Sequence, residues 1–153
     1  RLAEEAKKDP RIILIDASYR SDEIIGLMQS CDCFISLHRS EGIGLSLAQS
    51  MLLGKPVIAT GYSGNMDFMC EDNSCLVKYE LIPVGKNEYP FAKGQVWADP
   101  DVDHAAWYMK RLVADDDYRK AIAMNGQTYI LTHHNCAVIG ERYLERLQEL
   151  GLV

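Results

Sequence analysis

The residues best suited to chemistry lie in one short stretch, EGIGLSLAQ, which runs from Glu41 to Gln49. Glu41 supplies a carboxylate, and Gly42 and Gly44 leave the backbone beside it uncovered by side chains. A turn of this kind that opens a helix can present free amide groups to an anion, and the helix dipole adds a partial positive charge. The stretch therefore predicts a phosphate-bearing ligand with hydroxyl groups within reach of Glu41.

A helix over residues 44–53 would carry this turn, and Gly54 and Pro56 mark its end. Gln49 lies five residues beyond the first helical residue, which is about 7.5 Å along the helix axis. Its amide would then reach a sugar hydroxyl on the nucleoside side of a bound diphosphate. The polar stripe on this helix consists of Ser46, Gln49 and Ser50. The alternative interpretation is that the stripe merely faces water.

Short apolar strands alternate with helical segments, which predicts an α/β fold with a parallel sheet wrapped by helices. Strands are expected at residues 11–16, 33–38, 57–60 and 75–79, and helices at about 1–8, 21–30, 44–53, 101–114, 117–131 and 136–150. Residues 80–100 break the pattern with three prolines and two glycines. We expect a long loop there, which either packs on its own domain or borders a cleft.

Composition and charge limit the classes of function. The chain has 153 residues, 48% of them apolar, which suits one globular domain. A net charge of −6 argues against non-specific binding of nucleic acid. There is no apolar run of about 18 residues, the length that spans a membrane. The five cysteines are odd in number and irregular in spacing, which favours reduced thiols in a cytoplasmic protein.

Further candidate ligand contacts follow the predicted strands, because ligands bind at the carboxyl ends of strands in open parallel sheets. Ser63, Gly64 and Asn65 come after the strand at 57–60, and they either contact a sugar or phosphate or form a plain turn. His38 ends the preceding strand and either lines a sugar pocket or is simply hydrogen-bonded at the strand end.

Together these residues resemble a known family. EGIGLSLAQ, the downstream MLLGKPVIATGYSGN and the upstream DPRIILI and SDEIIGLMQSCDCFISLHRSEG are similar to the signature of retaining glycosyltransferases of the GT-B fold, family four (group 1 glycosyltransferases). The resemblance covers residues 1–80 well and the helical tail, 101–151, in arrangement. It implies a Rossmann-like parallel sheet with flanking helices, forming the C-terminal, donor-binding half of such an enzyme. Residues 1–153 would be this single domain, N-terminally truncated in mid-helix at Arg1 and without its acceptor domain.

The resemblance also implies roles for individual residues. Glu41 would contact hydroxyls of the transferred sugar as the catalytic residue. Backbone amides at Ile43, Gly44 and Leu45 would hold the diphosphate, and position 49 would hold the ribose. Gln49 stands where the family usually has glutamate, so it could accept a ribose hydroxyl bond only without charge assistance.

The implied reaction transfers a sugar from a nucleotide-diphosphate donor to an acceptor with retention of anomeric configuration, without a metal or other cofactor. The family's basic residues for the diphosphate lie on a first strand that this sequence lacks. Arg39 either helps there or is a surface residue, and we expect the isolated chain to be inactive. A sugar or lipid-linked acceptor would bind through the missing domain. A role in polysaccharide or lipopolysaccharide assembly, and peripheral association of the full-length protein with the inner face of the membrane, are expectations from the family.

Other classes of function remain as alternatives. The main one is a non-catalytic nucleotide-sugar binding or interaction module, which Gln49 favours. A dinucleotide-dependent oxidoreductase would need a third glycine where Leu47 stands and an acidic residue where Thr60 and Gly61 stand. Another GT-B enzyme, such as a sugar-nucleotide epimerase or a phosphorylase, would use different residues in the turn.

Overall fold

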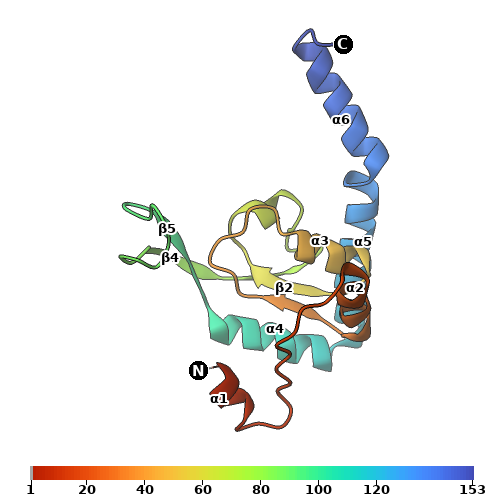
Figure 1. The fold of residues 1–153 in the computed structure, drawn as a ribbon. Helices are drawn as coiled ribbons and strands as arrows, with labels where there is room; N and C mark the ends of the chain where they lie inside the picture. The colour runs from red at the N-terminus through yellow and green to blue at the C-terminus, as the bar shows by residue number, and fades with distance from the viewer. Residues whose placement is uncertain (1) are drawn as a thin grey trace.

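Three parallel strands form the sheet that carries the candidate site (Figure 1). The structure is a computed structural model that describes residues 2–153. The sheet contains β1 (Phe34–Ser36), β2 (Val57–Thr60) and β3 (Cys75–Val77), in the order β1-β2-β3. Every residue of β2 is buried, as is usual for a central strand of a parallel sheet covered on both faces. The predicted α/β fold with a parallel sheet is confirmed.

Helices cover both faces of this sheet, and they also follow the predictions closely. They are α3 (Leu45–Leu52), α4 (Val102–Ala114) and α5 (Asp116–His133). On one face α3 and the end of α5 pack against β2 through Leu47, Met51, Val57, Ala59 and Ile130. On the other face α4 and the start of α5 pack through Ile58, Cys75, Val77, Ala105, Leu112 and Ile122. Alternate residues of β2 therefore serve opposite faces of the sheet, which holds the start of α3 at a fixed place above it.

Side-chain caps explain where the C-terminal helices begin. Asp101 accepts a hydrogen bond from the His104 amide at 2.9 Å at the start of α4, and Asp115 accepts one from the Tyr118 amide at 2.9 Å at the start of α5. Asn135 caps α6 (Cys136–Glu149) in the same way. No residue of α6 is buried, and the helix extends away from the sheet (Figure 1).

Residues 80–100, expected to be a long loop, instead lie largely in a β-hairpin. β4 (Tyr79–Pro83) pairs with β5 (Val96–Pro100) in an antiparallel ladder, and residues 84–95 connect them well away from the parallel sheet (Figure 1). Both Pro83 and Pro100 take the last position of their strand, where a missing amide hydrogen disturbs the ladder least. The hairpin thus tolerates the prolines that suggested a loop.

The strand predicted at residues 11–16 is wrong. After α1 (Leu2–Ala6) the chain runs without regular structure until α2 (Ser21–Ser30), and it pairs with no strand of the sheet (Figure 1). Its apolar side chains are exposed, Ile13 to 81%. A strand needs a neighbour for its backbone hydrogen bonds, and among the described strands β1 pairs only with β2. Arg1, expected in mid-helix, lies outside the described residues.

All five cysteines are free thiols. Cys75 is buried in the sheet and Cys33 is partly buried beside it, and burial raises the pKa of the Cys33 thiol to about 12. Among residues 2–153, no helix combines the length and the hydrophobicity that crossing a membrane requires.

Candidate functional site

The start of α3 presents a run of unpaired backbone amides. Gly44 is the N-cap, with a left-handed φ of 87° and no capping side chain. The first helical hydrogen bond runs from the Ala48 amide to the Gly44 carbonyl at 3.0 Å. In the part of the chain that the structure describes, the amides of residues 43–47 donate to no protein acceptor. Together with the helix dipole, these donors can hold an anion.

Glu41 lies directly beside these amides. Its own amide donates to Ser63 Oγ at 2.7 Å, and its carboxylate accepts a hydrogen bond from the Gly42 amide at 3.1 Å. The side chain is partly buried and lines a cavity of about 650 Å³ together with Gly42. No described basic residue forms an ion pair with it, so the carboxylate keeps acceptor sites for hydroxyl groups of a ligand.

The loop after β2 packs directly on this turn. The Gly64 amide donates to the Glu41 carbonyl at 3.0 Å, and a Cβ atom at position 64 would lie 1.9 Å from the Gly42 carbonyl oxygen. Ser63 has a φ of 74°, and its hydroxyl donates to the Tyr62 carbonyl at 2.6 Å. Gly64 and Ser63 therefore hold the turn in shape. A direct contact of either residue with a ligand stays a prediction.

A buried network ties the end of β1 to the same loop. The Asn65 side chain is fully buried, and its Nδ2 donates to the Thr60 carbonyl at 3.0 Å. His38 Nε2 lies 3.1 Å from Asn65 Oδ1 and 3.2 Å from the Tyr62 carbonyl, and its Nδ1 lies 3.3 Å from Ser36 Oγ. Because both partners of Nε2 are carbonyl oxygens, this nitrogen is the hydrogen-bond donor. Both residues hold the loop after β2 in place through these hydrogen bonds. Their contact with a sugar stays a prediction.

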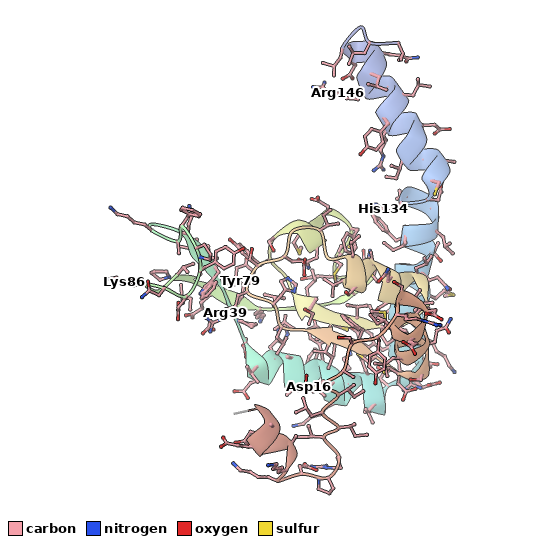
Figure 2. All side chains as sticks on the ribbon, viewed as in Figure 1. Asp16, Arg39, Tyr79, Lys86, His134 and Arg146 are labelled. Carbon is pink, nitrogen blue, oxygen red and sulfur yellow. The ribbon has the colours of Figure 1, made fainter. Side chains whose placement is uncertain are left out.

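Arg39 connects the turn to the hairpin. Its guanidinium lies 3.1 Å from Asp99 and 4.9 Å from the centre of the Trp97 ring, and its carbonyl accepts a hydrogen bond from the Ala98 amide at 2.8 Å. Figure 2 shows Arg39 at the base of the hairpin and Lys86 farther out along it. In the structure this side chain links the turn to β5 through Asp99 and Trp97. The predicted contact of Arg39 with a diphosphate remains untested.

The hairpin also completes the 650 Å³ cavity, so residues 80–100 border a cleft, which is one of the two alternatives that the sequence left open. Arg39, Ser40, Glu41 and Gly42 form one wall, and the opposite wall comes from the hairpin and its connection, including Tyr89, Phe91 and Trp97. The only signal in the sequence was the aromatic content of residues 80–100. Periodicity does not reveal where such a segment folds back.

Gln49 does not line the cavity that contains Glu41. Gln49 is exposed and lines a second cavity, of about 340 Å³, together with the exposed side chains of Ile43 and Leu45. The polar stripe expected on this helix is wrong for Ser50, which is buried and donates to the Ser46 carbonyl at 2.8 Å. The helix therefore offers its amides at one end and the single amide side chain of Gln49 along its flank.

Comparisons with known proteins identify the family and the fold. A model of the family described as glycosyl transferases group 1 matches residues 1–129. Among solved structures, the C-terminal domain of the group 1 family protein LpcC from Francisella tularensis is 22% identical, with a TM-score of 0.66 over 88% of this chain and 60% of that one. Anabaena HepE, solved in complex with UDP, is 23% identical, with a TM-score of 0.65 over 85% of this chain and 30% of that one.

A third similar structure is the sucrose-phosphate synthase of Thermosynechococcus elongatus. It is 19% identical and has a TM-score of 0.69 over 97% of this chain. The chain spans 60% of the LpcC domain, 30% of HepE and 32% of the synthase. At these identities the three structures establish a shared fold, that of C-terminal domains of GT-B proteins.

Proposed function

The chain belongs to the group 1 glycosyl transferases, and we propose that it is the donor-binding part of a retaining enzyme of that family. The observation that carries this proposal is the run of unpaired amides at residues 43–47 beside the carboxylate of Glu41. The diphosphate of a nucleotide sugar would accept hydrogen bonds from these amides. Glu41 would then bind hydroxyls of the sugar being transferred. Solved complexes of HepE with UDP, and with UDP and glucose, support a ligand of this class.

The chemistry follows from where charge develops. As the bond to the sugar breaks, the leaving nucleoside diphosphate gains negative charge, and the amides and helix dipole of α3 face that charge without having to reorganise. A metal is not needed for this stabilisation in our proposal, nor is another cofactor. Glu41 positions the sugar and stabilises its partial positive charge, and retention of configuration is the family's outcome rather than the result of a protein nucleophile.

The complete reaction belongs to a longer protein. Because the chain spans between 30% and 60% of the similar structures, we assign the acceptor, a sugar or a lipid-linked sugar, to a domain outside these residues. We propose that the isolated chain binds donor but does not transfer the sugar. We also propose that the full-length protein works in the cytoplasm, peripherally at the inner face of the membrane, in polysaccharide assembly.

A nuclear magnetic resonance titration tests the donor site directly. The 153-residue chain is titrated with UDP, GDP, ADP and dTDP while the backbone amide signals are followed. One of these nucleotides should shift signals clustered at residues 41–49, because those amides are the proposed donors. Amides at the C-terminal end of α6 provide the internal control, since that end of the helix extends away from the sheet (Figure 1). If every nucleotide leaves residues 41–49 unshifted, the proposal fails.

Gln49 favours one second candidate, a nucleotide-sugar binding module without catalytic activity. The resemblance places glutamate at this position, and the loss of its charge weakens a hydrogen bond to ribose. The two candidates differ in what the full-length protein does. Transfer of sugar that depends on Glu41 excludes the module, whereas binding of donor without any turnover would support it.

A further inference from the structure

The cavity between the Glu41 turn and the β4–β5 hairpin combines two kinds of surface. One wall carries the charged groups of Glu41 and Arg39. The other carries the aromatic side chains of Tyr89, Phe91 and Trp97. We propose that this cavity binds a pyranose ring, with Tyr89 and Phe91 packing against the face of the sugar. This inference rests on the proposed function and extends it to the hairpin, which the donor site described above does not use.

The exposure of the hairpin aromatics needs an explanation. Phe91 is 100% exposed and Tyr89 is 66% exposed, although both line the cavity. Large apolar groups that gather at a concave site without a protein partner mark a binding surface. The indole Nε1 of Trp97 is buried and has no hydrogen-bond partner among residues 2–153, so one polar group of this residue is left unsatisfied.

The combination of charged and aromatic groups in this cavity suits a sugar ring. A pyranose presents C–H groups on its faces and hydroxyls around its edge, so one face suits an aromatic ring and the edge suits a carboxylate and a guanidinium. Glu41 can accept from hydroxyls, and Arg39 can donate to them. The volume of about 650 Å³ falls inside the range of about 300–1,000 Å³ that is usual for small-molecule sites. A purely apolar ligand would cover the Glu41 carboxylate, which has no ion-pair partner among the described residues, without offering it a hydrogen-bond donor.

Contacts at the base of the hairpin fix Trp97 beside Arg39. Asp99 and Trp97 hold the Arg39 guanidinium, and the Ala98 amide bonds to the Arg39 carbonyl. At the other end of the ladder, the Val84 amide donates to the Gln95 carbonyl at 3.0 Å. A ring in the cavity would lie against Glu41 and Gly42, next to the amides of α3. It can therefore be the hexose of the donor or a sugar of the acceptor.

Calorimetric titration of the 153-residue chain distinguishes these two sources. The probes are UDP, UDP-glucose, and glucose added to the chain saturated with UDP, followed by the same set with GDP, GDP-mannose and mannose. The variants are Tyr89→Ala and Phe91→Ala, and Phe91→Tyr restores an aromatic ring. Tyr143→Ala is the matched control, because Tyr143 is 69% exposed on α6, away from the hairpin (Figure 1). Fluorescence of Trp97, isolated by Trp107→Phe, reports directly on the cavity wall.

We expect both alanine variants to bind the nucleoside diphosphate as the unmodified chain does. They should bind a sugar-bearing probe about tenfold more weakly, which Phe91→Tyr reverses. A loss confined to the nucleotide sugar assigns the cavity to the donor hexose, and a loss confined to the free hexose assigns it to the acceptor. Unchanged binding of every probe, or equal losses for nucleotide and sugar, would overturn the inference.

Failure of the proposed function is a separate outcome. If no nucleotide binds but glucose or mannose changes Trp97 fluorescence in a way that Phe91→Ala abolishes, the sugar cavity stands and the donor site fails. If neither nucleotide nor sugar has any effect, both proposals are overturned.

Discussion

Gly42, Gly44 and Gly64 lie around one turn, but the protein needs them for different reasons. Gly44 has a left-handed φ of 87°, and Gly64 has no room for a Cβ atom because the Gly42 carbonyl is in the way. At Gly42 an added Cβ would meet no protein atom within 4 Å. Packing therefore demands glycine at 44 and 64, while the open face of Gly42 suits a ligand that approaches the backbone.

Alanine substitutions separate folding from binding at this turn. Gly64→Ala should lower the free energy of unfolding by about 2–4 kcal/mol, because the two loops must move apart. Gly42→Ala should leave the unfolding free energy unchanged but weaken binding of the nucleoside diphosphate. Urea denaturation and calorimetric titration measure the two effects. A Gly64→Ala chain as stable as the unmodified one would contradict the packing argument, and Gly42→Ala with unaltered affinity would contradict the ligand argument.

Glu41 is predicted to act on the sugar rather than on the nucleotide. In the full-length protein, Glu41→Gln keeps the shape of the side chain but removes its charge, so we expect the transfer rate to fall about 10²-fold. Affinity for the nucleoside diphosphate should change little, because the amides of α3 remain. Steady-state kinetics and titration measure the two quantities. Glu71→Gln, at an exposed position outside the cavity, is the control. A normal transfer rate in Glu41→Gln would refute the assignment.

Among the elements, those with strong local signals could be predicted from sequence. α3 begins at a glycine with a positive φ and ends before Gly54, and the C-terminal helices begin at side-chain caps. The apolar run at residues 11–16 carries an equally strong strand signal, but a strand forms only where another strand can pair with it. The hairpin was missed because its prolines resemble those of a loop.

The candidate site shows the same division. The free amides of α3 could be predicted because a helix start follows from neighbouring residues alone. The contact of Gly64 with Gly42, the His38–Asn65 network and the aromatic wall of the hairpin join segments far apart in the chain. No pattern within a single segment specifies these contacts, so they became visible only in three dimensions.

We expect His134, at the junction of α5 and α6, to make the stability depend on pH. Burial lowers the pKa of His134, and the nearby charges of Arg142 and His133 lower it further. The folded chain then binds fewer protons than the unfolded chain below about pH 6.5, so this contribution to stability is present at higher pH and is lost as pH falls. Figure 2 shows His134 at this junction, and its ring lies 6.0 Å from that of Phe68.

Replacing His134 should therefore reduce the pH dependence. Between about pH 7.5 and pH 5.5, the unfolding free energy of the unmodified chain should decrease more than that of His134→Gln. Urea denaturation at several pH values measures this difference. His133→Gln is the neighbouring control and should retain most of the dependence. Identical pH profiles for His134→Gln and the unmodified chain would show that this histidine does not contribute.

For the whole molecule, the direction of the strands explains how distant segments form one site. The three strands of the sheet are parallel, so their carboxyl ends meet at one edge. The Glu41 turn follows β1, the loop with Gly64 follows β2, and the hairpin follows β3. The amides, the carboxylate and the aromatic wall therefore come together although nearly 60 residues separate Glu41 from Trp97.

Within residues 2–153, the same sheet has an unpaired edge at β1, which can bind another chain. Among the described strands β1 pairs only with β2, so its outer backbone groups are free to bond with another chain, and Ile35 beside them is exposed. Repulsion between molecules that each carry a net charge of −6 opposes such contacts, and dissolved salt screens that repulsion. Concentrated solutions of this chain should therefore stay clear at low ionic strength and form aggregates as salt is added.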